Sequence, residues 1–381
     1  MNIGIDAHML GHNETGNETY VLELVRALAV RDPGDTFFVY VENPHALSPE
    51  ITNAAQVRVV PYATRSGARR LVWELSRRAA QDCLDVLHLS YNAPLHVPPA
   101  CALVVTIHDI SFEHFPQFFS RRLRAFLRVS VPRSAYAAQH IITDTESAKR
   151  DLVNTYRLPP DKITVTHYAA GAQFHPISDP AALNAVRARY NTGDRFILAV
   201  GNLQPRKNLE RLMRAFALAK QHAALPHKLV IVGQRLWRAA PILQAARGMP
   251  DQVILTGYVP ATDLPLLYNA ADVLAYPSLY EGFGLPVLEA MACGTPVITS
   301  NVSCLPEIAG DAAHLINPRS VQDIADALVR VTTDTAYRGE LGRRGVARAQ
   351  LFSWERTAQQ TLAVYYSAIA RKRAATRTVL A

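Results

Sequence analysis

Two glutamates separated by seven residues bracket a glycine-containing turn in the second half of the chain. Glu281 is followed by Gly-Phe-Gly-Leu-Pro, and Glu289 stands inside the segment that comes next. Glycine lets a backbone approach a ligand closely, and Pro286 suits the first turn of a helix because the N–H that it lacks would be unpaired there. The pattern predicts a helix N-terminus that can bind an anion through the amides of Gly282, Phe283, Gly284 and Leu285.

A pair of cations precedes these acids along the chain. Arg206 and Lys207 come just after an apolar segment at 196–201 and open a helical pattern. Arginine can contact phosphate oxygens through two N–H groups at once, and lysine supplies a compact positive charge. Glu289 is placed to accept hydrogen bonds from two neighbouring ribose hydroxyls, and Glu281 is placed to face a sugar. The combination is typical of a site for a nucleotide-diphosphate sugar.

One arrangement of apolar segments occurs twice along the chain. The segments alternate with helical patterns, such as those at 20–30, 68–80 and 120–138, which predicts parallel sheets covered by helices on both faces. The fold class is therefore α/β, with two doubly wound Rossmann-like domains. The expected strands are 3–6, 36–41, 57–63, 85–89, 102–109, 140–144 and 162–169 in the first domain, and 196–201, 228–233, 252–259, 272–278, 296–300 and 313–318 in the second.

A stretch of small residues and prolines at 169–180 interrupts this pattern and indicates a hinge. We therefore expect an N-terminal, acceptor-side Rossmann-like domain at 1–172 and a nucleotide-sugar-binding Rossmann-like domain at 173–352. The remaining residues, 353–381, are expected to form a helix at 354–370 that packs back toward the N-terminal domain, followed by a mobile basic tail.

Two strand ends of the first domain carry further candidate residues. Ligands of doubly wound sheets bind beyond the carboxyl ends of the strands. A polar loop with Gly11 and Gly16 follows the first expected strand, and the strand at 102–109 ends on His108 and Asp109. These loops are where we expect the first domain to meet its ligand.

Composition limits the class of protein. A chain of 381 residues, with 19% charged and 49% hydrophobic residues, is long enough for two globular cores. The start of the chain shows no signal-peptide pattern, and no apolar run reaches the length of a membrane-spanning helix. The four cysteines have neither zinc-site nor disulfide-framework spacing, which favours a reducing, cytoplasmic setting.

A formal net charge of +8 favours an anionic partner. Nucleic acid is not expected, because no recognisable nucleic-acid-binding module accompanies the charge. Two arginine-rich stretches, at 65–78 and 115–133, have helical spacing, and the second interleaves arginines with phenylalanines and leucines. Such a helix suits an anionic membrane surface, which would make the protein peripheral at the inner face of the plasma membrane. The alternative is a solvated helix face over an ordinary core; Trp73, Trp237 and Trp354 are interpreted as packing residues.

Several motifs together resemble the retaining glycosyltransferases of the GT4-type (group 1) family, which have the GT-B fold. The motifs are EGFGLPVLEAMACGTPVI with its E-x7-E spacing, GNLQPRKNLERLMRAF, LTGYVP with DLPLLYNAADVLAYPSLYEGFGLP, and TDTESAKRDL. The resemblance covers nearly the whole chain and is strongest from Phe196 to Pro318. It implies two doubly wound domains that face a central cleft.

The resemblance also implies roles for the acids and cations of the second domain. Glu289 matches the acid that binds the donor ribose, and Glu281 matches the acid near the hydroxyls of the donor sugar, beside the amides of the glycine-containing turn. Arg206 and Lys207 match the cations that bind the diphosphate. No metal is expected, because these cations replace it and the strand ends carry no D-x-D motif.

Four further positions take implied roles from the same resemblance. His108 matches the residue that contacts the transferred sugar, and Gly16 matches a glycine-loop position near the phosphate, although this loop holds fewer glycines than the family pattern. The backbone around Tyr258 and Val259 corresponds to the pocket for the base. The residues implied in catalysis are His108, Glu281, Arg206 and Lys207.

The implied activity is the transfer of a hexose from a nucleotide-diphosphate sugar to a glycan or lipid-linked acceptor, with retention of the anomeric configuration. The chain as a whole favours mannose from GDP-mannose, while backbone recognition of the base leaves GDP and UDP open. Two alternatives stay open: a GT-B epimerase of nucleotide sugars, and a binding scaffold without transfer activity.

Overall fold

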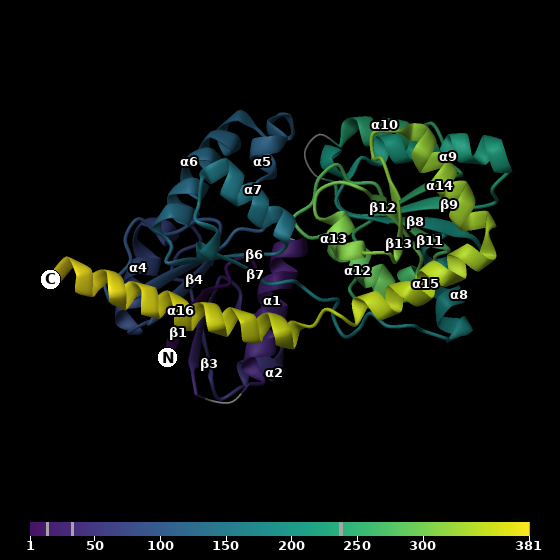
Figure 1. Ribbon diagram of the computed structural model, residues 1–381. Helices are drawn as coiled ribbons and strands as arrows, with labels where there is room; N and C mark the ends of the chain where they lie inside the picture. Colours follow the sequence, from purple (N-terminus) through teal and green to yellow (C-terminus); the bar gives the residue numbers. More distant parts are fainter. Residues whose placement is uncertain (13–14, 32–33, 236–238, 381) are drawn as a thin grey trace. The chain divides into compact units, whose positions relative to one another are not determined.

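The computed structural model describes residues 1–12, 15–31, 34–235 and 239–380 and is shown in Figure 1. The chain divides into two compact units. The N-terminal unit comprises Met1–Tyr168 together with Ser353–Ala381, and the second unit comprises Ala169–Phe352. Within the described residues, no helix has both the length and the apolar character needed to cross a bilayer.

The N-terminal unit is built on a parallel sheet of seven strands in the order β3-β2-β1-β4-β5-β6-β7. Its central strands are buried along their whole length, as expected for near-continuous apolar segments covered on both faces. The strand order reverses at β1, whose neighbours are β2 and β4. The strands are β1 (Asn2–Asp6), β2 (Thr36–Val41), β3 (Val57–Pro61), β4 (Val86–Ser90), β5 (Ala102–Thr106), β6 (His140–Thr143) and β7 (Ile163–Val165).

Helices connect these strands in the described part of the unit. They are α1 (Thr15–Ala29), η1 (Pro44–Ala46), α2 (Pro49–Thr52), α3 (Gly67–Arg69), η2 (Arg70–Glu74), α4 (Leu75–Gln81), α5 (Ser111–His114), η3 (Pro116–Phe118), α6 (Arg121–Ala137), α7 (Glu146–Tyr156) and η4 (Pro160–Lys162). The helix predicted at 68–80 contains a π-helical turn, η2, which buries Arg70 and Glu74. The prediction that Trp73 packs inside the protein is wrong: its side chain is 56% exposed, because it lies on the outer side of this turn.

Helix α16 (Trp354–Leu380) completes the N-terminal unit from the far end of the chain. It packs on α1 and on β4, β5 and β6, where the Tyr365 hydroxyl lies 2.7 Å from Nδ1 of His88. The helix continues to Leu380, past the expected end at residue 370, and the mobility of the basic tail stays a prediction. No glycine or proline interrupts 354–380, and Arg371 forms an ion pair with Asp161 at 2.8 Å.

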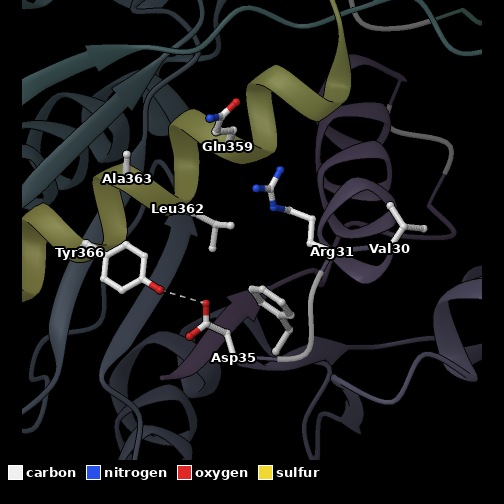
Figure 2. A pocket seen from close by; sticks show the side chains of 9 residues that line it. Val30, Arg31, Asp35, Gln359, Leu362, Ala363 and Tyr366 are labelled. Atoms are coloured by element: carbon white, nitrogen blue, oxygen red, sulfur yellow. Dashed lines mark hydrogen bonds between the residues drawn. The ribbon is translucent and has the colours of Figure 1, made fainter.

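A hollow of about 710 Å³ lies beside α16 in this unit (Figure 2). It is lined by residues at the end of α1 and the start of β2 on one side and by Gln359, Leu362, Ala363 and Tyr366 on the other. The Tyr366 hydroxyl donates to Asp35 at 3.4 Å, and Asp35 also binds the N-terminal amine at 2.8 Å. These contacts fasten the start of the chain to its last helix.

The second unit is built on a parallel sheet of six strands in the order β10-β9-β8-β11-β12-β13. The strand order reverses between β8 and β11, because the chain adds β9 and β10 on one side of β8 and β11 to β13 on the other. In doubly wound sheets this switch point is where ligands bind. The strands are β8 (Phe196–Val200), β9 (Lys228–Val232), β10 (Val253–Gly257), β11 (Val273–Tyr276), β12 (Val297–Ser300) and β13 (Ala313–Ile316).

The helices of the second unit carry buried apolar side chains onto this sheet. Met213 and Phe216 of α9, for example, are fully buried in the same core as Ile197 and Leu229. The described helices are α8 (Pro180–Tyr190), η5 (Pro205–Lys207), α9 (Leu209–Ala223), α10 (Ala240–Arg247), α11 (Leu264–Ala270), α12 (Leu285–Ala292), α13 (Leu305–Ala309), α14 (Val321–Thr333) and α15 (Thr335–Ala349).

The predicted fold class, α/β with two doubly wound parallel-sheet domains, is confirmed. Each of the thirteen expected strands has a counterpart in the two sheets. Helix α1 begins at Thr15, before the predicted start at residue 20, so Gly16 lies in its first turn and not in the loop where it was expected.

Candidate active site

The two predicted cations stand at the carboxyl end of β8, on the short 3₁₀ turn η5. Asn208 follows them with φ of +59° and donates to the carbonyls of Pro277 and Pro318, at 2.9 and 2.7 Å. The backbone oxygen of Arg206 accepts from the amide of Leu279 at 2.9 Å. The turn is therefore tied to the segment that follows β11, the neighbouring strand at the switch point.

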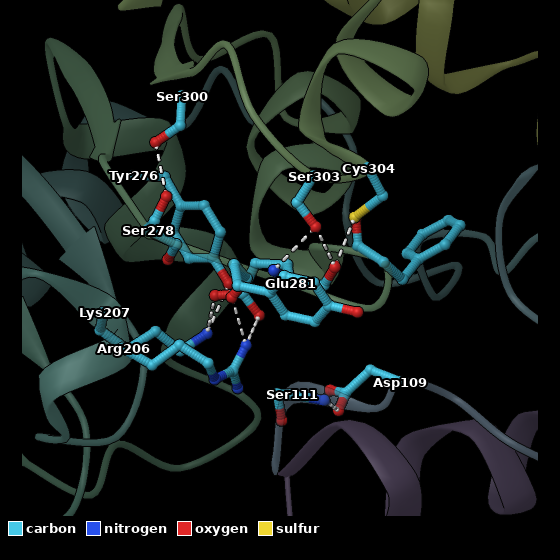
Figure 3. Close-up of polar contacts among 12 residues, drawn as sticks. Asp109, Ser111, Arg206, Lys207, Tyr276, Ser278, Glu281, Ser300, Ser303 and Cys304 are labelled. Carbon is cyan, nitrogen blue, oxygen red and sulfur yellow. Dashed lines mark hydrogen bonds and ion pairs between the residues drawn. The ribbon is translucent and has the colours of Figure 1, made fainter. Parts of the chain in front are cut away.

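Glu281 lies between these cations (Figure 3). Its Oε2 atom is 2.6 Å from Nη1 of Arg206, and its Oε1 atom is 2.8 Å from Nζ of Lys207. Lys207 also donates to the Tyr276 hydroxyl at 2.6 Å, and Arg206 to the carbonyl of Tyr280 at 2.6 Å. Sequence reasoning placed the cations and the acid at one site, but it did not anticipate their direct ion pairs.

The protonation state of Glu281 follows from this environment. The residue is only 6% exposed. Burial alone would raise the pKa of Glu281, but the charges of Arg206 and Lys207 outweigh it and lower the pKa to about 2. The carboxylate is therefore ionised at neutral pH, and the two cations with one carboxylate carry one net positive charge.

Gly201 keeps open the path of the Lys207 side chain. A Cβ atom at Gly201 would lie 2.9 Å from Cε of Lys207, and the backbone there has φ of +144°. Both the close approach and the dihedral angle require glycine. The residue just after β8 thus determines where the lysine ammonium can lie.

The turn after Glu281 is fastened at several points (Figure 3). The Ser303 hydroxyl donates to the carbonyl of Glu281 at 2.6 Å, and the Cys304 thiol lies 3.1 Å from the carbonyls of Glu281 and Phe283. Gly284 has φ of +96°, and a Cβ there would lie 2.8 Å from Leu305. The turn is thus held in one shape at the N-terminus of α12, where first-turn amides lack helical acceptors.

Glu289 has a different environment from Glu281. It lies in the second turn of α12, is 9% exposed, and accepts a hydrogen bond from the Tyr268 hydroxyl at 2.7 Å. Burial raises the pKa of Glu289 to about 7, although the hydrogen bond from Tyr268 acts in the opposite direction. The two acids of the E-x7-E motif therefore have pKa values on opposite sides of the ordinary glutamate value.

The predicted base-pocket residues follow β10, the edge strand of the second sheet. Tyr258 is 58% exposed and Val259 is buried. They lie at the same edge of the sheet as Arg206 and Glu281, because the carboxyl ends of parallel strands share one edge.

His108 stands just after β5 in the N-terminal unit and is 4% exposed. Its Nδ1 atom lies 3.1 Å from both carboxylate oxygens of Asp144, which follows β6, and it also contacts the Tyr168 hydroxyl. The Nε2 atom is buried without a hydrogen-bond partner among the described residues. Burial raises the pKa of Asp144, although His108 and Tyr168 act in the opposite direction.

Aromatic rings surround this histidine. The ring centres of Tyr20 and Tyr91 lie 5.0 and 5.3 Å from that of His108, both edge to face. Gly16, in the first turn of α1, has no atom within 4 Å of a Cβ built on it, so packing does not require glycine there. Asp109 accepts from the amide of Ser111 at 2.8 Å and thereby shapes the segment after β5.

Sequence reasoning missed several partners of the predicted site residues. Asn208 could have been found, because it directly follows the cation pair and precedes a helix. Asp144 was predicted only as the last residue of the expected strand 140–144, although it follows its strand as His108 does. Tyr268 and Tyr276 had no sequence signal, since a tyrosine in an apolar segment is interpreted as a core residue.

The two doubly wound parallel sheets give the chain the GT-B fold, which solved glycosyltransferases share. In structure, the chain is similar to sucrose-phosphate synthase from Thermosynechococcus elongatus, with a TM-score of 0.74, 22% identity and coverage of 97% of this chain and 99% of that one. It is also similar to Anabaena Alr3699/HepE, solved in complex with UDP and glucose, with a TM-score of 0.74, 19% identity and coverage of 96% and 100%.

The sequence comparisons identify the family. Residues 15–169 match the model described as Glycosyltransferase Family 4, and residues 184–348 match that of the glycosyl transferases group 1. The chain is 31% identical over 368 residues to the O-antigen chain mannosyltransferase B of Escherichia coli, covering 92% of this chain and 96% of that protein. The chain belongs to the group 1 glycosyl transferases of family 4, and it is a glycosyltransferase.

Proposed function

We propose that the protein transfers a hexose from a nucleotide-diphosphate sugar to a glycan or lipid-linked acceptor, with retention of the anomeric configuration. The observation that carries this proposal is the cluster of Arg206, Lys207 and Glu281 at the switch point of the second sheet. Two cations and a fastened glycine turn suit a diphosphate, and the acid suits sugar hydroxyls.

In the proposed reaction, the bond between the anomeric carbon and the diphosphate oxygen breaks, and its electron pair leaves with the nucleoside diphosphate. The acceptor hydroxyl forms the new bond on the same face of the sugar, and its proton passes to the leaving phosphate oxygen. Negative charge on the diphosphate grows as the bond breaks. Arg206 and Lys207 would stabilise that charge more strongly in the transition state than in the ground state.

Glu281 has two parts in this scheme. Its ion pairs orient both cations before the donor binds, so that little reorganisation is required when charge develops. Its carboxylate can also accept from hydroxyls of the transferred sugar, because a carboxylate has more acceptor sites than two hydrogen bonds occupy. We therefore count Glu281, Arg206 and Lys207 with His108 as the catalytic residues.

The remaining site residues would bind the two ends of the donor. Glu289 would accept the ribose hydroxyls, exchanging its hydrogen bond from Tyr268 or sharing it, and the backbone at Tyr258 and Val259 would contact the base. His108, with Nδ1 directed at Asp144, presents Nε2 for a hydroxyl of the transferred sugar. Gly16, where no side chain obstructs, would lie near the phosphate.

Mannose from GDP-mannose is the donor that we propose first. The supporting observation is the similarity to a mannosyltransferase over nearly the whole length of both chains. The similarity to a protein solved with UDP and glucose makes UDP-linked glucose the second candidate. The sugar and the base are therefore the two variables that a donor panel must separate.

We propose that no metal ion takes part, because Arg206 and Lys207 provide the positive charge that a bound cation would otherwise supply to the diphosphate. Turnover should then be unchanged in excess EDTA after exhaustive dialysis. A loss of activity that Mg²⁺ or Mn²⁺ restores would overturn this part of the proposal.

The proposed place of action is the cytoplasm, at the inner face of the plasma membrane. All four cysteines, Cys83, Cys101, Cys293 and Cys304, are free thiols, which suits a reducing compartment. A lipid-linked acceptor would be presented at that face, and a glycan acceptor is consistent with the similarity to an O-antigen chain mannosyltransferase.

The test is transfer from a panel of GDP- and UDP-linked hexoses to mannosyl oligosaccharide acceptors, with the product's anomeric configuration read from the one-bond C1–H1 coupling in NMR. Lys207→Ala should lower kcat by about 100-fold or more, the effect of losing one preorganised charge donor in other enzymes. Arg214→Ala is the matched control, because Arg214 is an exposed cation on α9 outside the cluster. Inversion of configuration, or undiminished turnover in Lys207→Ala, would contradict the proposal.

A further inference from the structure

Large apolar side chains stand exposed on the N-terminal unit, at positions to which the proposed reaction assigns no role. Val72 and Trp73 on η2 are each 56% exposed, Leu95 is 66% exposed, and Phe126 and Val129 on α6 are 50% and 71% exposed. Exposed apolar side chains that gather on one face of a protein mark an interaction surface. The proposed transfer reaction does not account for them.

Hydrogen bonds join the segments that carry these side chains. The amide of Leu95 donates to the carbonyl of Leu71 in η2 at 3.3 Å. The amide of Ala93, two residues earlier, donates to the Ser134 hydroxyl of α6 at 2.8 Å, and Arg133 of α6 donates to the carbonyl of Pro94 at 3.3 Å. The loop with Leu95 thus lies between η2 and α6.

Helical spacing extends this face along α6. Val129 lies one turn before Arg133, and Phe126 and Leu123 lie one and two further turns toward the start of the helix. Leu123 is 42% exposed. We define the arginine–apolar surface as Val72, Trp73, Leu95, Leu123, Phe126 and Val129, together with the exposed arginines of the same segments.

The charge of this surface is of one sign. Residues 65–78, 91–100 and 120–137, all of them described, contain a single acid, Glu74, and it is buried. The guanidinium of Arg77 lies 4.9 Å from the ring centre of Trp73, so the charge and the apolar area are intermixed. The exposed arginines are Arg65, Arg69, Arg77, Arg121, Arg122 and Arg128, of which Arg128 pairs with Glu113.

We propose that the arginine–apolar surface binds the headgroup layer of an anionic lipid bilayer. Apolar side chains enter the boundary between headgroups and acyl chains, while the arginines stay at the level of the lipid phosphates. This inference goes beyond the transfer reaction and does not depend on it. The proposed occupant of the exposed apolar side chains is therefore the lipid bilayer.

Charge decides between the bilayer and the other possible occupants. A second copy of the chain would bring like-charged arginines together across a twofold interface. Single-stranded nucleic acid could stack on Trp73 and Phe126, but Val72, Leu95, Leu123 and Val129 offer no flat face for a base. A negatively charged bilayer satisfies the arginines and the aliphatic side chains together.

The experiment is vesicle co-sedimentation of the full chain with phosphatidylglycerol–phosphatidylethanolamine vesicles and with phosphatidylcholine vesicles. Each mixture is measured at about 50 mM and at about 500 mM salt, because the higher concentration screens the attraction between surface charges much more strongly. Binding should occur to the anionic vesicles at low salt and fall steeply at high salt. The triple variant Arg69→Ala, Arg77→Ala, Arg122→Ala should partition about 100-fold more weakly, since each arginine near an anionic surface contributes roughly fivefold.

The apolar contribution is tested separately. Phe126→Ala and Trp73→Ala should each weaken partitioning roughly tenfold, and brominated lipid should quench a fluorescence component that is missing in Trp73→Phe. The matched controls are Arg343→Ala and Leu351→Ser, exposed positions of the second unit. Nucleoside diphosphate binding, measured without vesicles, should be the same in all these variants.

Three outcomes would overturn the inference. They are equal binding to neutral and anionic vesicles, unchanged binding in the arginine and aromatic variants, and self-association without lipid that these substitutions abolish. Loss of donor turnover with intact vesicle binding would instead count against the transfer reaction alone.

Discussion

The Oε1 atom of Glu281 lies 2.8 Å from the Nζ atom of Lys207, so the acid after β11 and the cation after β8 form an ion pair at the switch point of the second sheet. Both side chains are nearly buried, at 7% and 11% exposure. Breaking a buried pair leaves an uncompensated charge and is costly. The geometry of the two residues is therefore coupled, and neither can be altered without an effect on the other.

Glu281→Gln should separate ground-state binding from catalysis. Without the negative charge of Glu281, the positive charges of Arg206 and Lys207 are no longer offset by a carboxylate. A nucleoside diphosphate should therefore bind about tenfold more tightly. The value of kcat should nevertheless fall by at least about tenfold, since tighter binding of the ground state does not lower the barrier and the cations lose their orientation.

Isothermal titration calorimetry and steady-state kinetics measure the two effects, and thermal unfolding checks that the fold persists. Unchanged nucleoside diphosphate affinity in Glu281→Gln would show that the carboxylate does not compete with the diphosphate for the cations.

Glu289 should make stability depend on pH. Burial raises its pKa from 4.5 to about 7, so between these values the folded state holds a proton that the unfolded state has released. The free energy of unfolding should therefore fall as pH rises from about 4.5 through 7, by at most about 3 kcal/mol from this group. Below 4.5 both states are protonated, and the contribution is fully present.

The glutamine in Glu289→Gln cannot ionise, so the free energy of unfolding of this variant should lack the decline. The measurement is denaturant unfolding of the wild-type protein and of the variant across about pH 4 to 8, the range in which the linkage relation places the effect. The wild-type protein should also bind a nucleoside diphosphate more tightly above pH 7, where the ionised carboxylate of Glu289 can accept hydrogen bonds from two ribose hydroxyls. Parallel pH profiles for the two proteins would contradict the role of Glu289.

Asp144 should act on the reaction through His108. Its carboxylate accepts from Nδ1 of the histidine and so leaves Nε2 for the proposed contact with the transferred sugar. Asp144→Asn should lower kcat about tenfold or more with a smaller change in KM, as a positioning residue would. In a double-mutant cycle, adding Asp144→Asn to His108→Ala should have almost no further effect on kcat.

A residue that only stabilises the fold gives a different result. Its substitution would lower kcat by the same factor whether or not His108 is present. Additive effects in the cycle would therefore remove Asp144 from the mechanism, and circular dichroism of each variant would establish that the comparison is between folded proteins.

The fold was predictable because its signals are local and repeated. Near-continuous apolar segments such as 196–201 and 228–233 can be buried only in a sheet covered on both faces. The number of such segments in each half of the chain gives the number of strands in each sheet. Element ends were less predictable. Helix α16 passes the expected end at residue 370, because charged residues on an exposed helix face resemble a solvated tail in sequence.

The site was predictable in its residues but not in its contacts. Arg206, Lys207 and Glu281 could be chosen because each follows a strand, and parallel strands end at one edge. Their mutual ion pairs depend on the dihedral angles of Gly201 and Asn208, which sequence does not display. The prediction for Trp73 was wrong because a tryptophan in a helical pattern is usually interpreted as a core residue. In the structure, η2 directs this side chain outward.

The central claim, that Arg206 and Lys207 bind the donor diphosphate, is tested most directly by the affinity ratio of a nucleoside diphosphate to the corresponding monophosphate. Calorimetry on the wild-type protein, Lys207→Ala and the control Arg214→Ala gives this ratio for each. The wild-type protein and the control should prefer the diphosphate by about 100-fold, roughly two charge-assisted contacts, and Lys207→Ala should lose at least about tenfold of that preference. An equal preference in all three proteins would contradict the claim.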